Sequence, residues 1–442
     1  MNDEIINKLQ KIVQKILDKY HENPSTKIFI NNFRWMAFGI GFDFIIKSIY
    51  FVIIARILGA KDYGVFAGVL AIVTFLSPFV TWGSESILVK NISRDKNKFP
   101  DYWGSAITIT LLLSTVMSVL VVGITFIIFR QPQTVLIAFF IAIGDFLGLR
   151  LCGVSGQAFQ SFEKLKYTSI ISIMISMFRL ISAILMLWLG MSGNVFSWSI
   201  FYMFSGLFAG LISVIMVSVL LGHGKFGLHL LRREWAEGFY FAIDYSSQGI
   251  YNDIDKTILL RLDGEMSTGA YSVSYRFIDV ITVPLRAIIA SAYPRFFTQG
   301  QNGLIFSARY ALRLIPYTTG FALIGGAGFF LVRGYIPLLL GEDYSGIVMI
   351  IPWLIPVLLF RSIHYLASNA LTGADLQNVR SFVQVSIAIL NILLNLILIP
   401  KLGWFAAALS SIICDGLLVL GLWGIILIKS EVFQKKVHNR GR

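Results

Sequence analysis

The chain has 442 residues, of which 56% are hydrophobic and 14% are charged, and its formal net charge is +13. A soluble domain of this size cannot bury so much apolar surface, so the composition excludes a soluble globular protein. Apolar stretches of about 20 residues recur along the chain, and each can cross a hydrocarbon layer roughly 30 Å thick. These features predict an all-α polytopic membrane protein.

The chain opens with a polar, lysine-rich segment, residues 1–27, that does not match a cleavable signal peptide. Within residues 1–20, Ile5, Leu9 and Ile12 fall on one face of a helix and lysines surround the other. This pattern predicts an amphipathic helix on the cytoplasmic surface of the membrane, with a solvated tail as the alternative.

Apolar runs bounded by charge, Gly or Pro predict about twelve membrane helices, six in each of two lobes. Their approximate bounds are 35–57, 65–90, 103–129, 134–157, 167–189, 196–221, 236–260, 269–294, 310–331, 347–371, 381–399 and 403–428. The predicted divisions are a cytoplasmic segment 1–27, an N-terminal lobe 28–221, a cytoplasmic linker 222–235, a C-terminal lobe 236–428 and a basic tail 429–442.

The distribution of basic residues predicts the orientation. With both termini in the cytoplasm, inside segments hold 23 Lys and Arg and outside segments hold six. This asymmetry follows the positive-inside rule and predicts an even number of spans. Because the basic residues lie in short loops, a membrane explains the net charge better than a nucleic acid does. Cys152 and Cys414 both lie in apolar runs, so we expect neither a disulfide framework nor a metal site.

A short segment repeats at a constant offset of 205 residues. Arg56, Gly59, Gly64 and Phe66 correspond to Arg261, Gly264, Gly269 and Tyr271. Each copy joins the first and second helices of a predicted six-helix half. The halves are therefore predicted to be parallel repeats related by an axis along the membrane normal, with a site between them, as in alternating-access transporters.

Eight Lys and Arg fall inside predicted spans, where each costs on the order of 3 kcal/mol at a helix centre. Lys256, Arg313 and Arg150 lie near helix ends, and we expect them to extend toward the membrane surface. The deeper five are predicted to line a wet, cationic central cavity: Lys47, Arg179, Arg276, Arg286 and Arg361.

Acidic and amide residues accompany these cations at helical spacing. Asp43 precedes Lys47 by four residues, and Asp279 follows Arg276 by three. A polar stripe on the predicted seventh helix is formed by Asp244, Gln248, Asn252 and Asp255. Interhelical ion pairs that hold the bundle together are one interpretation of any single charge. A surplus of deep cations instead predicts an anionic ligand such as a lipid pyrophosphate, since Arg binds phosphate oxygens bidentately.

Buried carboxylates are candidates to carry a coupling ion, H⁺ or Na⁺, and we assign this role to Asp43, Asp244 and Asp255. No cofactor is expected. His364 is the one histidine in a predicted span, and a packing or gating role for it is favoured over catalysis.

The segment Ala55-Arg-Ile-Leu-Gly-Ala-Lys-Asp-Tyr-Gly-Val-Phe66 resembles the first loop of the Wzx-type polysaccharide flippases, in the multidrug/oligosaccharidyl-lipid/polysaccharide (MOP) exporter superfamily. Trp82-Gly83, Asp255-Lys-Thr-Ile-Leu-Leu-Arg-Leu262, Gly269-Ala-Tyr-Ser272 and a late Asn391…Asn395 pair extend the resemblance along the chain after residue 30.

This resemblance implies a MATE-like fold of two six-helix lobes. It also implies ion-coupled movement of an undecaprenyl-pyrophosphate-linked oligosaccharide across a bacterial inner membrane, for O-antigen, capsule or exopolysaccharide synthesis. The expected partners are the bilayer, the lipid-linked glycan, and the polysaccharide polymerase and chain-length proteins. A MATE-like small-molecule exporter and a membrane-embedded glycan-processing enzyme are the alternatives. The chain carries no Walker-type nucleotide loop, which argues against direct coupling to ATP.

Overall fold

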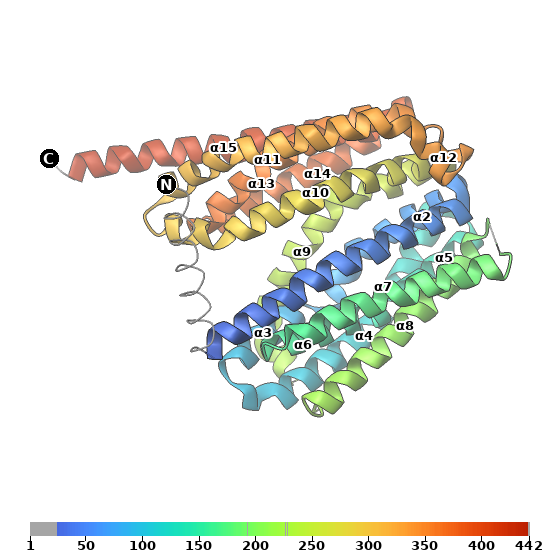
Figure 1. Cartoon of the computed structure of the whole chain (residues 1–442), viewed down its shortest axis with the longest axis horizontal. Helices are drawn as coiled ribbons and strands as arrows, with labels where there is room; N and C mark the ends of the chain where they lie inside the picture. Colours follow the sequence, from blue (N-terminus) through green and yellow to red (C-terminus); the bar gives the residue numbers. More distant parts are fainter. Residues whose placement is uncertain (1–23, 192, 226, 228, 441–442) are drawn as a thin grey trace, which may run out of the picture.

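The computed structural model describes residues 24–191, 193–225, 227 and 229–440, and every regular element in these ranges is helical (Figure 1). The first half contains α2 (Pro24–Thr81), α3 (Ser84–Arg94), η1 (Lys96–Lys98), α4 (Phe99–Phe129), α5 (Pro132–Ile143), η2 (Gly144–Leu149), α6 (Arg150–Ser161), α7 (Leu165–Trp188) and α8 (Val195–Leu220). The second half contains α9 (His229–Leu262), α10 (Glu265–Gly300), α11 (Leu304–Val332), η3 (Arg333–Tyr335), α12 (Ile336–Leu340), η4 (Glu342–Tyr344), α13 (Ile347–Gly373), α14 (Gln377–Leu402) and α15 (Trp404–Arg440). The amphipathic helix predicted within residues 1–20 lies outside the described residues.

The repeated segment makes the same backbone turn in both halves. Gly59 has φ 67° and ψ 173°, where α2 folds back on itself, and Gly264 has φ 91° and ψ 177° between α9 and α10. A side chain is strained at such positive φ values, whereas glycine adopts them freely. The sequence repeat therefore has a physical cause: each half needs glycine at its first reversal.

Nine helices of the described ranges are long and apolar enough to cross a membrane. The first of these, Phe38–Arg94, contains the reversal at Gly59. The nine do not include α9 and α10, whose side chains the structure describes only in part. The all-helical, multi-pass membrane fold is confirmed, whereas the number of twelve spans stays a prediction.

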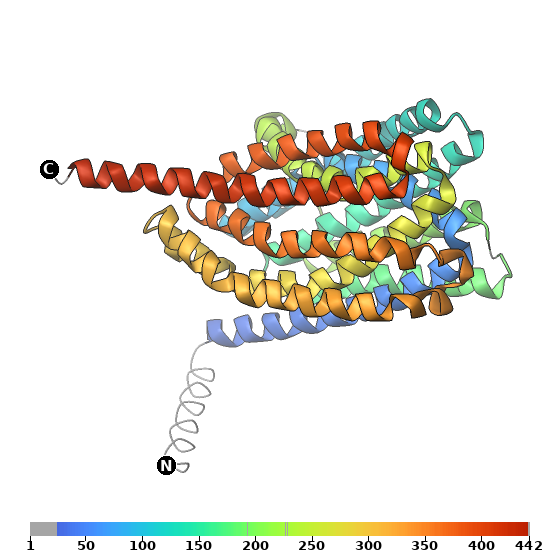
Figure 2. The same cartoon turned by 90° about the horizontal axis from the view of Figure 1, so that it is seen from above.

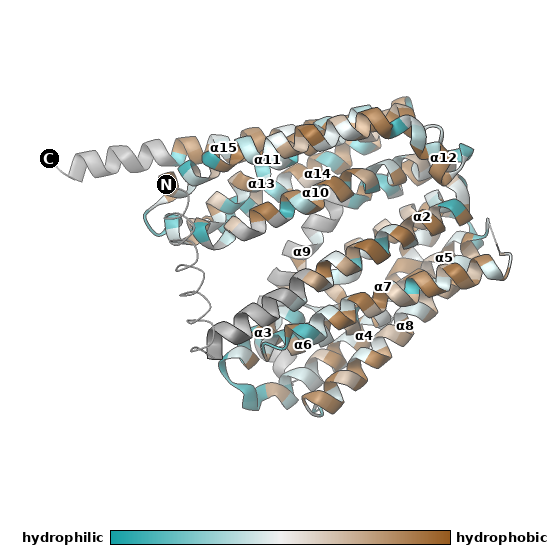
Figure 3. Cartoon of the chain, in the orientation of Figure 1, coloured by the Kyte–Doolittle hydropathy of each residue, from teal (hydrophilic) through white to brown (hydrophobic). Residues whose placement is uncertain are grey.

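Apolar side chains cover much of the outer surface of the helices. Hydrophobic residues predominate along the helices, and hydrophilic residues are concentrated at the connecting loops (Figure 3). Exposed side chains such as Val119, Ile127 and Ile324 show that large apolar groups point away from the packed interior. Water would penalise this arrangement and lipid would not, as expected for a bilayer-spanning bundle.

The helices form two bundles with α9 between them (Figure 1). Helices α2 and α4–α8 pack together in one bundle, and α10, α11 and α13–α15 pack in the other. Helix α9 packs against both α2 and α14. The exact lobe and linker bounds expected from the sequence stay predictions.

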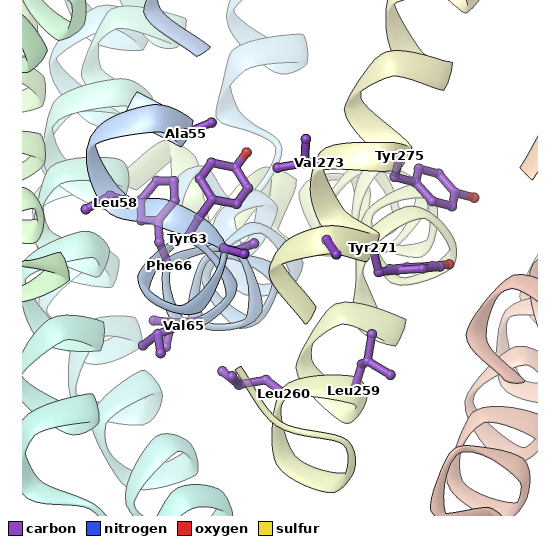
Figure 4. Close-up of a cluster of buried hydrophobic side chains, with 14 of the residues drawn as sticks. Ala55, Leu58, Tyr63, Val65, Phe66, Leu259, Leu260, Tyr271, Val273 and Tyr275 are labelled. Atoms are coloured by element: carbon purple, nitrogen blue, oxygen red, sulfur yellow. The ribbon is translucent and has the colours of Figure 1, made fainter. Parts of the chain in front are cut away.

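Three clusters of buried hydrophobic side chains show where the bundles meet. The shared core, which runs from Ile54 to Ala408, draws residues from both bundles, including Phe66 and Tyr271 (Figure 4). A second core lies wholly between Ile87 and Val217, in the first bundle. A third lies between Leu285 and Ile426, in the second bundle. The bundles are therefore joined at the end that carries the Gly59 turn and have separate cores toward the other end.

The start of α2 and the end of α15 lie at the same end of the molecule, opposite the Gly59 turn (Figure 1). Helix α15 projects beyond the other helices there (Figure 2). We call this end the terminal end, and the opposite end, which carries Gly59 and Gly264, the joined end.

Candidate site between the two bundles

The joined end is closed by close backbone packing. A Cβ placed on Gly64 would lie 2.8 Å from the backbone nitrogen of Gly269, which leaves no room for a side chain. Nearby, the Thr257 hydroxyl donates a 2.7 Å hydrogen bond to the Gly68 carbonyl. The Tyr344 hydroxyl donates at 2.9 Å to the carbonyl of Ala55. These contacts tie the first bundle to the second.

At the terminal end, the start of α9 packs on the first bundle through what we call the tryptophan contact, formed by Trp82, Trp235 and Phe239. The Trp82 and Trp235 ring centroids are 4.1 Å apart, and the Trp82 indole donates a 3.0 Å hydrogen bond to the Trp235 carbonyl. Glu234 accepts a 2.9 Å hydrogen bond from Tyr102. The start of α9 is thus held by the first bundle. The other end of α9 leads through Gly264 into α10 of the second bundle.

A small cavity lies where the bundles come together, with a volume of about 40 Å³. Its wall includes Tyr63 from α2, Asp253 and Lys256 from α9, and Arg276 from α10. Lys256 is buried and forms an ion pair with Asp253. Our expectation that Lys256 extends toward the membrane surface was therefore wrong, because a carboxylate three residues earlier stabilises it inside the protein.

Lys47 is the predicted site residue of the first bundle that is most open to solvent. Its side chain is 57% exposed, and its ammonium lies 2.7 Å from Asp43, which is 13% exposed and also accepts a hydrogen bond from Ser176. The pair confirms that Asp43 and Lys47 share one helix face. The carboxylate lies behind the ammonium, so the cation is the group presented outward.

Arg179 instead belongs to a buried cluster. It donates a 2.6 Å hydrogen bond to the Tyr202 hydroxyl and lies 3.8 Å from the carboxylate of Asp145. Tyr202 in turn donates to Asp145 at 3.1 Å. Asp145 lies on η2, a π-helical turn, and such turns occur frequently at functional sites.

Arg150, which we expected to extend toward the membrane surface, is also held inside the first bundle. Its Nε donates a 2.6 Å hydrogen bond to Ser77, and its guanidinium lies 3.6 Å from Glu85. That expectation was wrong because polar partners on α2 and α3 reach the guanidinium. Arg313, the third residue of that set, is exposed.

In the second bundle, Asp279 connects an exposed arginine to a buried one. The guanidinium of Arg286, 57% exposed, lies 3.8 Å from Asp279 Oδ1. The guanidinium of Arg361, 1% exposed, lies 3.6 Å from the same oxygen. Arg276, exposed on the same helix, lies near Asp279 and hydrogen-bonds Tyr63 of the first bundle.

Behind Arg361 lies a buried acid and a buried imidazole. Arg361 Nε is 3.8 Å from Asp415 Oδ2, and His364 Nε2 is 2.8 Å from Asp415 Oδ1. Arg361 also donates a 2.8 Å hydrogen bond to the Tyr275 hydroxyl. His364, for which we expected a packing or gating role, thus contacts a specific buried carboxylate.

Asp255 is buried and accepts a 2.6 Å hydrogen bond from Tyr271. The side chains of Asp244, Gln248 and Asn252, predicted on the same helix, lie outside the described part of the structure. The polar stripe therefore stays a prediction apart from its last member.

The surplus of deep cations expected from the sequence is largely offset within the described helices. Asp145, Asp253 and Asp415 were absent from our predicted set, and they lie beside Arg179, Lys256 and Arg361 respectively. Counting acids inside the predicted spans as carefully as cations would have found them. The site is distinguished by the difference in exposure within each ion pair. Lys47 and Arg286 are more exposed than their carboxylate partners, Asp43 and Asp279.

The comparisons with known proteins agree with this architecture. An uncharacterised membrane protein of Methanocaldococcus jannaschii is 24% identical over 411 residues, which cover 87% of this chain and 94% of that protein. An Escherichia coli (strain K12) protein named "Putative O-antigen transporter" is 21% identical over 338 residues, covering 74% and 79% of the two chains.

Two solved structures share the fold. An inward-facing multidrug resistance MATE family transporter of the MOP superfamily matches with a TM-score of 0.73 at 13% identity, covering 87% of this chain and 96% of that one. The lipid II flippase MurJ, in an inward closed conformation, matches with a TM-score of 0.70 at 16% identity, covering 88% and 87%. The family model described as "Polysaccharide biosynthesis protein" matches residues 29–299. The chain therefore belongs to the polysaccharide biosynthesis protein family and has the fold of MOP-superfamily transporters.

Proposed function

We propose that the chain is a flippase that moves an undecaprenyl-pyrophosphate-linked oligosaccharide across the bacterial inner membrane for the synthesis of a surface polysaccharide. The observation that carries this proposal is the set of exposed cations, Lys47, Arg276 and Arg286, on helices of the two bundles that have separate cores toward the terminal end. Membership of the polysaccharide biosynthesis family supports the glycan part of the substrate.

The charges suit a pyrophosphate. Arg276 and Arg286 can each donate two parallel hydrogen bonds to phosphate oxygens, while Lys47 acts as a point charge. Each charge-assisted hydrogen bond contributes about 1.5–3 kcal/mol, and the three cations would act together on one headgroup. Asp43 and Asp279 are partly shielded, and a phosphate can displace them from the cations without having to enter the protein core.

An exposed apolar stripe on the first half of α2 suits the lipid chain. Phe38, Phe42, Ile45 and Ile49 are exposed at helical spacing, and the Phe38 and Phe42 rings stack with centroids 5.6 Å apart. This stripe and Lys47 belong to the same helix. A polyprenyl chain could lie along the stripe in the bilayer while its pyrophosphate reaches the cations.

Transport in this proposal proceeds by alternating access. The joined end closes one side of the membrane, and breaking the contacts around Gly64 and Gly269 would open it. The positive-inside distribution supports a cytoplasmic location for the terminal end. The candidates for coupling to H⁺ or Na⁺ remain Asp43, Asp244 and Asp255. The buried Arg179 and Arg361 would add positive charge inside the protein, beneath the exposed cations. The proposed partners are the polymerase and chain-length proteins.

Deletion tests the proposal. A strain without the protein should accumulate unpolymerised lipid-linked oligosaccharide in the cytoplasmic leaflet, and expression of the chain should restore surface polysaccharide. Normal polysaccharide in the deletion strain, with no accumulated intermediate, would contradict the proposal. Drug sensitivity alone would favour a MATE-like exporter, and glycosyl or acyl transfer by the purified protein would favour an enzyme.

A further inference from the structure

A continuous chain of charged side chains leads from the exposed surface of the second bundle into its core. Arg286 contacts Asp279, Asp279 contacts Arg361, Arg361 contacts Asp415, and Asp415 contacts His364 at 2.8 Å. The exposed fraction falls from 57% at Arg286 to 34% at Asp279 and 0% at Asp415. The buried end of this chain has no role in the phosphate site just described.

Each carboxylate in this chain is shared. Arg286 and Arg361 approach the same oxygen of Asp279, and Asp415 is divided between Arg361 and His364. With His364 neutral, this chain places two carboxylates beside two guanidinium groups, while Asp253 also acts on Arg361, and Arg276 and Lys256 also act on Asp279. His364 Nδ1 and Asp415 Oδ2 are buried without a hydrogen-bond partner among the described residues, so either atom can accept a proton.

We propose that the His364–Asp415 pair is a proton site linked to anion binding at Arg286, so that the proton and the phosphorylated lipid bind the same state of the protein. This inference rests on the proposed function and adds the identity of the coupling ion, its site and the sign of the coupling. It extends the coupling candidates beyond the carboxylates chosen from the sequence.

Because the carboxylates are shared, protonation of the His364–Asp415 pair is expected to strengthen phosphate binding at Arg286. A proton on His364 gives Asp415 a full cationic partner, and a proton on Asp415 removes its charge. In both cases Arg361 interacts more strongly with Asp279, and Asp279 holds Arg286 less. Arg286 then becomes available to a phosphate, and the whole chain gains one positive charge. Because linkage is reciprocal, phosphate binding must favour proton uptake.

The other polar groups around the pair leave this sign unchanged. Tyr275 on α10 and Cys414 on α15 face Asp415, and Tyr365 on α13 contacts the His364 ring. Beyond them, Asp255 on α9 faces Tyr275, Asn391 on α14 hydrogen-bonds Cys414, and Thr319 on α11 hydrogen-bonds Ser362. Tyr275 bonds Arg361 and Asp255 bonds Tyr271. His364 is thus the one imidazole in direct contact with Asp415 among the described residues.

Titration calorimetry of the purified full-length protein with farnesyl pyrophosphate tests the inference. Measurements in buffers of different ionisation enthalpy give the protons taken up per bound probe. Wild type should take up more protons than His364→Gln, which keeps a polar group facing Asp415 but cannot become cationic. The probe affinity of wild type should weaken by up to about tenfold per pH unit as the pair loses its proton. Subtracting the variant removes the titration of the probe itself.

His223→Gln is the matched control, because His223 is exposed in the connection after α8. This control should take up protons as wild type does. Equal uptake by wild type and His364→Gln would overturn the inference while leaving the flippase proposal intact. Absence of probe binding by wild type would instead contradict the proposed function.

A measurement on unaltered protein covers the case in which His364→Gln does not fold. The chain has five histidines, so nitrogen-15 labelling of histidine gives few NMR signals, and infrared difference spectra report protonated carboxyl groups. Probe binding should produce a new imidazolium signal or a new protonated carboxyl band. Spectra without either change would refute the proton site.

Discussion

Gly64 and Gly269, which occupy equivalent positions in the sequence repeat, pack directly against each other where the two bundles join. A Cβ on Gly64 would lie 2.8 Å from the backbone nitrogen of Gly269 and closer still to the carbonyl of Glu265. These two repeated glycines therefore allow the backbones of the two halves to pack directly against each other. The nearby ion pair between Lys61 and Glu265, 3.6 Å long, is exposed and adds little stability.

We expect Gly64→Ala to weaken closure of the joined end. Inserting a methyl group into close packing costs about 1–3 kcal/mol, so the thermal unfolding midpoint and polysaccharide export should both fall. Gly123→Ala is the matched control, since a Cβ there meets nothing within 4 Å. Unchanged stability and export in Gly64→Ala would show that the joined end tolerates separation.

We expect Lys47→Ala and Arg286→Ala to abolish export while leaving the protein in the membrane. Each loses a charge-assisted contact worth about 1.5–3 kcal/mol with the proposed pyrophosphate, or roughly tenfold to 150-fold in affinity. Surface polysaccharide and accumulated lipid-linked oligosaccharide are the readouts. Arg309→Ala, an exposed cation outside the proposed site, should export normally. Full complementation by both site variants would remove the cationic site from the mechanism.

We expect Asp415→Leu to destabilise the second bundle severely. Removing one member of a buried ion pair costs about 3–5 kcal/mol because the other charge stays buried. The double variant Arg361→Met/Asp415→Leu should regain much of the stability, measured by thermal unfolding in detergent, without regaining export. A double variant no more stable than Asp415→Leu would argue that the two residues are energetically independent.

We expect Trp82→Ala to release the start of α9 from the first bundle. The change removes the hydrogen bond to Trp235 and an aromatic pair worth about 0.5–1.5 kcal/mol beyond its buried area. Hydrogen exchange of the backbone around residue 235 should accelerate. The exposed Trp188, replaced in the same way, serves as control and should leave that exchange unchanged.

The sequence predicted the membrane class and the repeat because both depend on local patterns. Apolar runs follow from the thickness of the bilayer, and Gly59 and Gly264 follow from the backbone conformation of a tight reversal. It could not predict that Lys256 is buried or that Asp415 meets His364. Those contacts depend on which helix faces cross in space, and helical spacing along one chain segment does not contain that information.

Helix α9 illustrates the same limit. Its sequence from Asp244 to Lys256 is rich in acids and amides, so apolar runs define it less clearly than they define the nine strongly apolar helices. Its membership in the fold rests on packing against α2 and α14.

The distribution of the three cores also bears on how the protein is made. The core between Ile87 and Val217 uses residues from the first bundle alone, so it can consolidate in the membrane while the ribosome is still adding later helices. The shared core requires residues from Ile258 onward. The nascent first bundle must therefore wait, with its joining face unpaired, until the second half has been synthesised, and that interval is when chaperones or premature contacts with other nascent chains would act on this protein.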